Sequence, residues 1–452
     1  MSTVDRGIVI IGAGMAGFGA AYRLSQSKVR PTIFDERDQL GGHTCSYKLD
    51  GFIFDDGPHI SFTEDKRFQR LLAESVGQQF ERVKAYVNNY WQGHWIRHPA
   101  HANLYGLPPE LIVKCIKELV DVTNSPTPAI KNYQQWLEAS YGPTFANTFP
   151  GEYTKKYHTT EPRNLTTDWL GPRLYRGNLE EVVRGALVPE SADLHYIDKF
   201  RYPSHGGFVS YLNKFALLAD QHFGHRLTQI DVEEKGLFFA NGTTVGFQKL
   251  ISSVPLPRLI PLIKGAPQHV RKAASELAVT KVVIVNIGLT RQDVSRAHWT
   301  YFYDADVCFS RLSFPHLLSP NTVPPGCGSI QAELYFSDKY KPFKSTPNDL
   351  IELVINDLRK CGLLRDSDEI IHRSAWLTSG NVIFDRDRPN ALRTVHAYLD
   401  EIGIAYCGRY GDWGYMWTDE SFMSGERAAD KILTNYRHCR NPTGFVHLES
   451  SL

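Results

Sequence analysis

The residues of this chain that are best suited to chemistry form a glycine-rich run near its start. Gly12, Gly14 and Gly17 have the spacing G-x-G-x-x-G and come directly after the apolar run Ile8–Ile11. In such a run the first glycine permits a tight turn, the second lets backbone N–H groups approach a pyrophosphate, and the third allows close helix packing. The pattern predicts a dinucleotide bound at the start of a helix.

An acidic residue occupies the position at which such sites hold a ribose. The second apolar run, residues 31–34, ends in Asp35, a little over twenty residues after Gly12. A carboxylate at this point accepts hydrogen bonds from ribose hydroxyls. Glu36 is an alternative for this role, and glycines that only shape a turn beside a solvated acid are another. The combined spacing favours dinucleotide binding through Asp35.

A pair of glycines extends the predicted site. Gly41 and Gly42 follow six residues after Asp35, and Thr44 and Ser46 come next. Backbone and hydroxyl donors can therefore line a second stretch of phosphate and ribityl chain. This pattern is similar to that of the FAD-binding amine oxidases and glutathione-reductase-like proteins, more than to that of the nicotinamide dehydrogenases, so FAD is the expected cofactor.

A second glycine-rich signature lies near the other end of the chain. Residues 408–415 read Gly-Arg-Tyr-Gly-Asp-Trp-Gly-Tyr, and a helix is predicted after them at residues 424–433. The two signatures together predict one flavin site that is closed from both ends of the sequence.

The elements that must position these residues follow from hydrophobic periodicity. Small and apolar residues at 16–24 predict a helix after the first glycine turn. Residues 279–289 and 329–336 are rich in β-branched and aromatic side chains, which favours an antiparallel sheet that forms one wall of a substrate cleft. Further helices are predicted at residues 68–75, 109–120, 133–141, 179–187, 209–219 and 348–361.

The expected fold class is α/β. It combines a Rossmann-like FAD-binding domain of the glutathione-reductase type with an inserted helical domain and an antiparallel β-sheet substrate domain. A chain of 452 residues accommodates about three units of ~150 residues. The predicted boundaries are 1–90, 201–275 and 401–452 for the three parts of the FAD-binding domain, 91–200 for the helical domain and 276–400 for the sheet domain.

Composition excludes several classes of partner. Fifty basic and forty-nine acidic side chains give a formal charge of +1, so no overall field steers the chain to nucleic acid or to an anionic membrane. Seven scattered cysteines without C-x-x-C spacing argue against a disulfide framework, and His94, His98 and His101 lack a further ligand for a metal. No apolar run is long enough for a signal peptide or a membrane span. A cytoplasmic location is expected.

Several motifs in a fixed order cover most of the chain. They are Gly-Pro-His at 57–59, Glu-Tyr-Thr-Lys-Lys at 152–156, Trp-Leu-Gly-Pro-Arg at 169–173, Tyr301 with Arg311 and Ser-Pro at 319–320, and the closing runs 408–415 and 421–425. This set resembles the flavin-dependent UDP-galactopyranose mutases, especially their eukaryotic branch. That family shares its fold with amine oxidases and protoporphyrinogen oxidases.

The resemblance implies roles for individual residues. Arg173, Arg311 and His59 are the predicted catalytic residues, with His59 beside the flavin. The residues expected to contact FAD are Gly12, Gly14, Gly17, Asp35, Gly41, Gly42, His59, Gly408, Arg409 and Ser421, and those expected to contact substrate are Arg173, Tyr301, Arg311 and Tyr415.

Guanidinium groups suit a substrate that carries a diphosphate. Arg173 and Arg311 can each grip phosphate oxygens through bidentate, charge-assisted bonds worth roughly 1.5–3 kcal/mol. Ordinary surface or ion-pair arginines are the alternative. Tyr301 and Tyr415 could equally be core aromatics with bonded hydroxyls, and His59 has a side chain whose ordinary pKa suits a general base as well as a structural hydrogen bond.

The function implied by the resemblance is a nucleotide-sugar mutase of the kind used in polysaccharide biosynthesis. Reduced flavin N5 would attack the anomeric carbon of a nucleotide-diphosphate sugar and allow pyranose and furanose forms to interconvert. NADPH or another reductant would keep the flavin reduced. The alternative is an FAD-dependent oxidoreductase similar to the amine and protoporphyrinogen oxidases. The sequence leaves open whether the protein forms a homo-oligomer.

Departures from the mutase motifs concern the sugar more than the cofactor. The second histidine of the Gly-Pro-His element is absent, since Ser61 and Phe62 stand there, and the tryptophan that follows the Tyr-Thr-x-Lys element is replaced near Tyr157 and His158. Residues 381–384 read Asn-Val-Ile-Phe in place of a segment with a substrate tyrosine. The sequence therefore leaves open which sugar is used.

Overall fold

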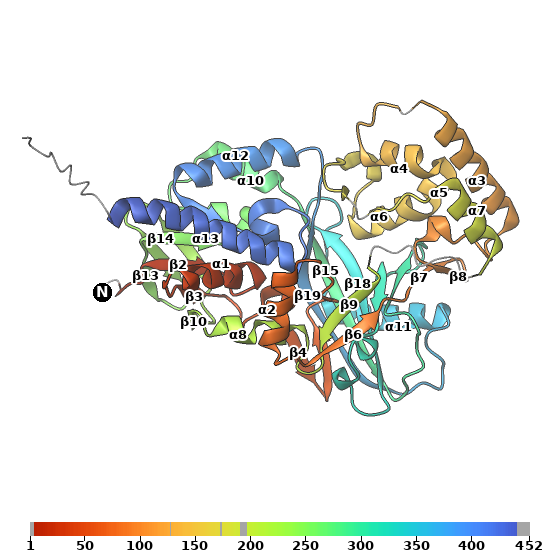
Figure 1. The fold of residues 1–452 in the computed structure, drawn as a ribbon, viewed down its shortest axis with the longest axis horizontal. Coiled ribbons are helices and arrows are strands. Elements are labelled where there is room, and N and C mark those ends of the chain that lie inside the picture. The colour runs from red at the N-terminus through yellow and green to blue at the C-terminus, as the bar shows by residue number, and fades with distance from the viewer. Residues whose placement is uncertain (1–3, 127, 172–173, 190–196, 441–452) are drawn as a thin grey trace, which may run out of the picture. The chain divides into compact units, whose positions relative to one another are not determined.

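The computed structural model describes residues 4–126, 128–171, 174–189 and 197–440. These residues fold into two compact units, each of which collects segments that lie far apart in the sequence (Figure 1). Unit 1 comprises residues 1–42, 212–274 and 393–452, and unit 2 comprises residues 43–211 and 275–392. The first segment of unit 1 thus ends at Gly42, whereas the sequence analysis extends the first part of the FAD-binding domain to residue 90.

A five-stranded parallel sheet forms the centre of unit 1. Its strand order is β10-β3-β2-β14-β20. All residues of β2 are buried, as expected for a central strand of a parallel sheet that is covered on both faces. The strands are β2 (Ile8–Ile11), β3 (Thr32–Phe34), β10 (Asp220–His222), β14 (Lys249–Ser252) and β20 (Ile404–Tyr406).

Two helices from opposite ends of the sequence pack against each other in unit 1. They are α1 (Met15–Gln26) and α13 (Thr418–Arg440), which run side by side (Figure 1). A Cβ atom built on Gly425 would lie 1.9 Å from the backbone oxygen of Ala16. Glycine at this position therefore lets the two backbones approach closely.

The close approach of these helices can be tested at Gly425. We expect Gly425→Ala to lower the free energy of unfolding by about 1–3 kcal/mol, the usual cost of overpacking, because the added methyl group overlaps a backbone oxygen. Urea unfolding measures the change. Arg427→Ala, on the exposed side of the same helix, is the control and should change little; equal stability of the two variants would contradict the packing.

A second sheet and short helices complete unit 1. The sheet has the order β1-β13-β12-β11, and its β12–β13 hairpin turns at the pair Asn241-Gly242, where Gly242 has φ +84°. The elements are β1 (Val4–Asp5), β11 (Leu227–Asp231), β12 (Gly236–Phe239), β13 (Thr244–Gly246), α8 (Asn213–Ala216), α9 (Leu256–Leu259), α10 (Gln268–Glu276) and α12 (Arg388–Glu401).

The helix predicted at residues 209–219 is wrong as a single element. The chain forms a 3₁₀ turn at Phe208–Leu212, then the short α8, and then β10. β10 pairs in parallel with β3 at the edge of the sheet. This pairing ends the helix early, and a three-residue polar edge strand carries no hydrophobic pattern from which it could be predicted.

A seven-stranded sheet forms the centre of unit 2. Its order is β19-β15-β18-β17-β16-β7-β8, and β15 pairs antiparallel with β18 as predicted. β19 has no counterpart in the sequence analysis, because its residues mix polar, small and apolar types. The strands are β7 (Val87–Trp91), β8 (His94–Arg97), β15 (Val279–Leu289), β16 (Trp299–Phe302), β17 (Arg311–Ser313), β18 (Gly328–Ser337) and β19 (Ile370–Val382).

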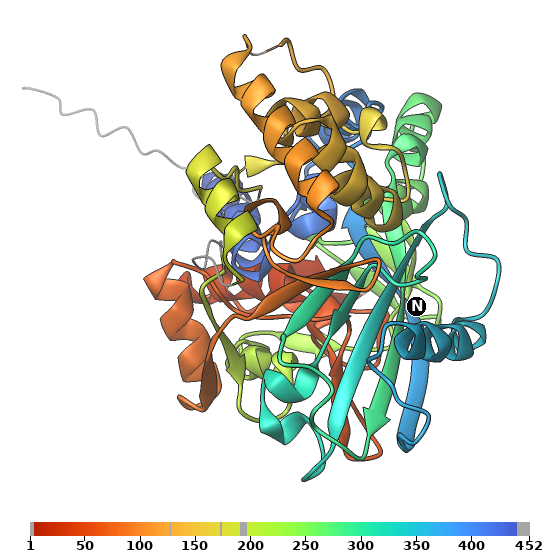
Figure 2. The ribbon, with the colours of Figure 1, turned by 90° about the vertical axis from the view of Figure 1, so that its right-hand side faces the viewer.

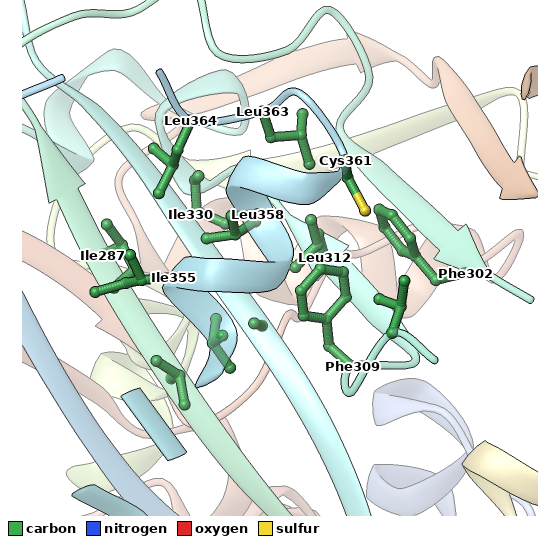
Figure 3. Packing of buried hydrophobic residues seen from close by; sticks show 14 of the residues in the cluster. Ile287, Phe302, Phe309, Leu312, Ile330, Ile355, Leu358, Cys361, Leu363 and Leu364 are labelled. Atoms are coloured by element: carbon green, nitrogen blue, oxygen red, sulfur yellow. The ribbon is translucent and has the colours of Figure 1, made fainter. Parts of the chain in front are cut away.

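One face of this sheet is apolar and is covered by α11 (Ile351–Lys360). Ile355 and Leu358 of the helix pack with Ile287 and Ile330 of the strands (Figure 3). Because side chains alternate across a strand, the intervening residues of the same strands point to the opposite face. That opposite face carries the polar side chains described below.

Five helices gather in one bundle within unit 2, drawn in orange to yellow in Figure 2. The bounds of α4 and α7 agree with the prediction, and α7 begins with a capping box in which Asn178 and Glu181 exchange hydrogen bonds. The helices are α3 (Pro109–Asn124), α4 (Tyr133–Tyr141), α5 (Pro143–Ala146), α6 (Glu152–Tyr157) and α7 (Leu179–Leu187).

Two antiparallel pairs and one helix complete unit 2. They are β4 (Ser46–Leu49) with β5 (Phe52–Asp55), β6 (Phe80–Lys84) with β9 (Lys199–Pro203), and α2 (Lys66–Ser75). Within the described ranges of both units, no helix combines the length and the apolar character that crossing a membrane requires.

Candidate active site

The first glycine signature forms a turn between β2 and α1. Gly12 has φ +111°, and a Cβ atom there would lie 2.0 Å from the hydroxyl of Ser253. A Cβ atom on Gly17 would lie 1.9 Å from the backbone oxygen of Gly12, so both positions require glycine. Gly14 precedes α1 and offers no side chain to cap it. The first N–H groups of the helix are therefore left for a phosphate.

The double glycine lies against this turn. The N–H of Gly41 donates to the backbone oxygen of Ala13 at 2.8 Å. Gly42 has φ +54°, and a Cβ atom on it would lie 3.1 Å from Cα of Gly14. A side chain on Gly14 would in turn meet Gly41 and Gly42 at 3.7 Å. The two glycine turns thus lie together and form one open cradle. Side chains at these positions would occupy the space inside it.

Asp35 ties the two turns to each other. Its carboxylate accepts the N–H of Ala13 at 2.7 Å and the N–H of Arg37 at 2.8 Å. Burial raises the pKa of Asp35, and these two bonds partly oppose the rise. Glu36 instead forms a two-pronged ion pair with Arg258, at 2.9 and 2.7 Å, which lowers the pKa of Glu36. Asp35 is therefore the acid inside the cradle.

The second signature reaches the start of α1 within unit 1. Gly408 has φ +75°, and a Cβ atom on it would lie 2.7 Å from Cβ of Ala16. Its N–H donates to the hydroxyl of Ser424 at 2.8 Å, and that hydroxyl donates to Asp412 at 2.6 Å. The two glycine signatures, almost four hundred residues apart in the sequence, therefore meet in one place.

Arg409 begins a π-helical turn, a form that often marks functional sites. Its Nε donates to the backbone oxygen of Met416 at 3.0 Å, and its guanidinium lies 5.5 Å from the ring centre of Tyr415. Ser421 lies in the first turn of α13, where its N–H donates to the backbone oxygen of Trp417. Their contacts with flavin or substrate stay predictions.

Arg311 and Glu333 dominate the polar face of the sheet in unit 2. They lie opposite each other on β17 and β18, and Nε and Nη2 of Arg311 donate to the two carboxylate oxygens at 3.0 and 2.7 Å. Tyr335 donates to the same carboxylate at 2.6 Å. The Glu333 side chain is 2% exposed and that of Arg311 is 23% exposed. The fork of Arg311 is thus directed at a protein carboxylate, and Nη1 is the nitrogen left for a ligand.

The charges of this pair depend on each other. Burial, the largest single effect, opposes the charge of Arg311, but the Glu333 carboxylate and the neighbouring tyrosines together outweigh it and raise the pKa of the guanidinium well above its ordinary value. Burial also opposes the charged form of Tyr335 and therefore raises its pKa, and the neighbouring Glu333 carboxylate adds to the rise. The cluster therefore holds one cation, one anion and a neutral phenol.

A row of aromatic rings crosses this face beside Arg311. Tyr157 lies 4.6 Å from Tyr335 and 5.2 Å from Tyr153, measured between ring centres. Tyr153 lies 5.4 Å from Tyr301, which lies 5.0 Å from His98. Tyr301 is half-buried, so the row continues to the surface. Such a row offers π faces to a planar or CH-rich ligand group.

The Gly-Pro-His element forms a turn after β5. Gly57 has φ +96° and lies above Ile284 of the sheet, since a Cβ atom on it would be 4.0 Å from that side chain. Nδ1 of His59 lies 2.8 Å from the backbone oxygen of Gly57. Because a carbonyl only accepts, Nδ1 carries the proton. The ring of His59 is therefore fixed within its own turn.

The side chain of Asp55, two residues before Gly57, is held by three hydrogen bonds. Its carboxylate is 4% exposed by residue and accepts hydrogen bonds from the hydroxyls of Ser46 and Tyr202 and from the N–H of Phe208. Burial raises the pKa of Asp55 to about 6, although the three bonds oppose the rise. Asp55 therefore changes its charge near neutral pH in the folded protein.

The raised pKa of Asp55 predicts a pH dependence of stability. Between the ordinary carboxyl pKa and about 6 the folded protein binds a proton that the unfolded chain has lost. The contribution of Asp55 to stability is therefore full below pH 4 and is lost as the pH rises through 6, by about 3 kcal/mol for a two-unit shift.

Urea unfolding at pH 4.5, 5.5 and 7 measures this effect. The Asp55→Asn variant lacks the titrating group, so its free energy of unfolding relative to wild type should increase as the pH rises. Glu64→Gln, at an exposed carboxyl, is the control. A constant difference between wild type and Asp55→Asn over this range would contradict the assignment.

The Trp-Leu-Gly-Pro-Arg motif is described only in part. Trp169 donates its indole N–H to the backbone oxygen of Thr166 at 2.8 Å and stacks on Phe384 at 5.7 Å. Arg173 lies outside the described residues. Its role at the substrate diphosphate stays a prediction.

The comparison with protein families decides where the chain belongs. A family model described as flavin containing amine oxidoreductase matches residues 15–433, which is most of the sequence. The chain belongs to this flavin-containing amine oxidoreductase family. Its cofactor is FAD, as the two glycine turns predicted.

This family member is similar in structure to a mutase. A crystal structure of reduced UDP-galactopyranose mutase is similar over 95% of this chain and 96% of that one, with a TM-score of 0.87 and 26% sequence identity. A protein described as a putative protoporphyrinogen oxidase from Exiguobacterium sp. 255-15 covers 96% of this chain with a TM-score of 0.73 and 14% identity, which shows a shared fold. The predicted fold class and the predicted resemblance are confirmed.

Two curated relatives are similar to this family member over a short stretch. It is 39% identical over 74 residues to a 4,4'-diapophytoene desaturase of Staphylococcus haemolyticus, and 34% identical over 76 residues to a 4,4'-diaponeurosporene oxygenase of Staphylococcus aureus. The stretches span 16% and 17% of this chain, and 14% and 15% of those proteins.

The residues of unit 1 fit FAD. The cradle of Gly12, Gly14 and Gly42 has no side chain, the start of α1 lacks a side-chain cap, and Asp35 lies between the turns. These features suit the pyrophosphate and the ribose of a dinucleotide. In this family member they are the residues that would hold the nucleotide part of the cofactor.

Two buried carboxylates of the polar face were not predicted from the sequence. Glu333 and Asp56 are both buried carboxylates with several donors. The signal for Glu333 is the alternation of Gln331, Glu333 and Tyr335 with apolar residues in β18, which places all three on one face. Asp56 has no such signal, because its partners come from β19, a strand that was not predicted.

Proposed function

We propose that this protein is a nucleotide-sugar mutase, which interconverts the pyranose and furanose forms of a nucleotide-diphosphate sugar. The observation that carries the proposal is the likeness to reduced UDP-galactopyranose mutase over 95% of the chain. The polar face with Arg311 and the aromatic row supports it, since both suit a phosphorylated, ring-bearing substrate. When bound and reduced, FAD supplies a nucleophile for the anomeric carbon without net electron transfer.

The residues of the chain bind and orient in this proposal. Nη1 of Arg311 donates to one phosphoryl oxygen, while Glu333 holds the guanidinium plane in a fixed direction. Tyr301 lies beside Arg311 on the neighbouring strand and covers the substrate. Arg173 and Tyr415 add the further diphosphate contacts, and His59 fixes the turn at the flavin. NADPH or another reductant would reduce the bound FAD before the first turnover, and isomerisation would then consume no further electrons.

A panel of nucleotide sugars tests the proposal. The purified protein is reduced with dithionite and incubated with UDP-galactopyranose, UDP-N-acetylgalactosamine or UDP-arabinopyranose under nitrogen, and products are separated by chromatography. We expect an isomer of equal mass with at least one of these sugars, and none with oxidised protein. Absence of isomers from the whole panel, with bound and reducible FAD, would sink the mutase assignment.

An oxidoreductase is the second candidate, and the family match favours it. The short likeness to the diapophytoene desaturase points in the same direction. Such an enzyme would work from oxidised FAD on an amine or an apolar CH–CH unit. Oxidised protein that turns over such a substrate and forms stoichiometric hydrogen peroxide would support this candidate over the mutase.

A further inference from the structure

Three side chains of unit 2 are joined by hydrogen bonds in the order serine, histidine, aspartate. Nε2 of His372 lies 3.0 Å from the hydroxyl oxygen of Ser374, and Nδ1 of His372 lies 2.8 Å from Oδ2 of Asp50. Because a carboxylate only accepts hydrogen bonds, Nδ1 carries the proton of the neutral ring. Nε2 is therefore unprotonated, and the hydroxyl of Ser374 donates to it. In this arrangement a histidine takes the proton of a serine nucleophile.

The backbone fixes each of the three side chains. His372 and Ser374 are two residues apart in the regular part of β19, so their side chains lie on one face of the sheet. Asp50 and Gly51 form the two-residue turn between β4 and β5, with φ +49° and +86°. The ring of Phe54 stacks on that of His372 at 5.5 Å. The β4–β5 hairpin thus supplies both the carboxylate and an aromatic ring that holds the imidazole in its plane.

The serine is accessible to solvent, and a buried amide lies beside it. Ser374 is partly exposed, whereas the side chain of His372 is 5% exposed. Asn286 lies opposite Ser374 on β15, and its Nδ2 is 3.4 Å from the serine hydroxyl oxygen. Gln331 donates to Oδ1 of Asn286 at 2.9 Å, which keeps the N–H groups of the amide directed toward Ser374. An amide N–H beside a serine nucleophile is a donor of the kind that stabilises an oxyanion.

We propose that Ser374, His372 and Asp50 form a second active site, which hydrolyses small carboxylic esters. Oγ of Ser374 bonds to the carbonyl carbon, its proton passes to Nε2 of His372, and the alcohol leaves with that proton. Water then bonds to the acyl carbon and gives a proton to Nε2, and the bond from this carbon to Oγ breaks as Oγ recovers the proton. Ser374 and His372 are the catalytic residues, and Asp50 is a positioning residue. No electrons are transferred, so the inference goes beyond the proposed function and does not depend on it.

Hydrolysis of p-nitrophenyl acetate by the oxidised, FAD-loaded protein tests this site. We expect Ser374→Ala and His372→Gln to lower the rate at least ~100-fold, the contribution of a general base to its nucleophile. Asp50→Asn should lower kcat at least ~10-fold and leave KM unchanged, because the imidazole loses its orientation while the ester keeps its contacts. Ser379→Ala, on the other face of the same strand, is the matched control and should keep the rate of wild type.

Covalent labelling gives a second readout. Phenylmethylsulfonyl fluoride should form a sulfonyl ester with Oγ of Ser374 as fluoride leaves, and peptide mass spectrometry should find the label at Ser374 and not at Ser379. His372→Gln should not be labelled. The proposal is overturned if folded Ser374→Ala hydrolyses the ester as fast as wild type, or if Ser374 of wild type takes no label. Neither readout uses a nucleotide sugar or reduced flavin, so failure of this site and failure of the mutase assignment are distinguishable.

Discussion

Replacing Arg311 by alanine is expected to weaken the binding of UDP about 10- to 100-fold, as the loss of one charge-assisted hydrogen bond of roughly 1.5–3 kcal/mol, and to lower the free energy of unfolding by about 3–5 kcal/mol. The guanidinium holds both oxygens of Glu333, whose side chain is 2% exposed. Its removal leaves a buried carboxylate with Tyr335 as its remaining donor. Urea unfolding measures the stability, and isothermal titration with UDP on dithionite-reduced protein measures the binding.

A double variant separates the two effects of Arg311. In Arg311→Met with Glu333→Leu both charges are absent and the volume is filled, so stability should return close to that of wild type. Binding of UDP should stay as weak as in Arg311→Ala, because no guanidinium faces the ligand. If the double variant binds UDP as wild type does, Arg311 has no part in the substrate site. If Arg311→Ala unfolds at the same urea concentration as wild type, the pair contributes no stability.

The pairing of Arg311 changes what this residue can do for a diphosphate. The sequence predicted a bidentate grip of Arg311 on phosphate, with an ion-pair arginine as the alternative, and in the structure Nε and Nη2 are directed at Glu333. The pair is electrically neutral as a whole, so Arg311 contributes direction more than charge. A diphosphate therefore needs a further cation, and Arg173 is the candidate in the motifs. The sequence alone did not predict that Arg311 would direct the ligand while Arg173 would supply the charge, because the pairing of Arg311 with Glu333 was not known.

The predicted fold agrees best with the structure where the sequence pattern is long and regular. The bounds of α4, α7 and β15 match the predictions residue for residue, since each segment carries an uninterrupted period of 3.6 residues or a run of β-branched residues. β19 and β10 were missed because their pairing partners, not their own composition, make them strands. Tertiary pairing of this kind leaves little local signal.

The residues of the candidate site also differ in how far they could be predicted from the sequence. Gly12 and Gly408 could be predicted because each has a positive φ and a neighbouring side chain too close for a Cβ atom, and Gly17 because the backbone oxygen of Gly12 lies against it; such constraints appear directly as glycine. The pairing of Arg311 with Glu333 depends on the register between β17 and β18, and Asp56 depends on a strand more than three hundred residues away. Neither the register nor the strand follows from one sequence.

Gly14→Ala is expected to weaken FAD binding at least ~100-fold, about 2.7 kcal/mol, while the apo protein keeps its fold. Gly14 has φ −90°, which alanine adopts readily, and the nearest atoms to a new Cβ lie at 3.7 Å. The methyl group thus strains no backbone but enters the space above Gly41 and Gly42, where a pyrophosphate must approach N–H groups. Quenching of FAD fluorescence on titration into apo protein measures the affinity.

The matched control is a glycine outside the cradle. Gly236→Ala in β12 places its Cβ 3.3 Å from the ring edge of Phe238, a side chain that can shift, so it should bind FAD as wild type does. Thermal unfolding with excess FAD gives a second readout, because a ligand that binds only the folded state raises the midpoint by mass action. The rise should be large for wild type and Gly236→Ala and small for Gly14→Ala. An equal rise for Gly14→Ala would show that the phosphates do not lie over this turn, and the cradle would then be only a packing device between β2 and α1.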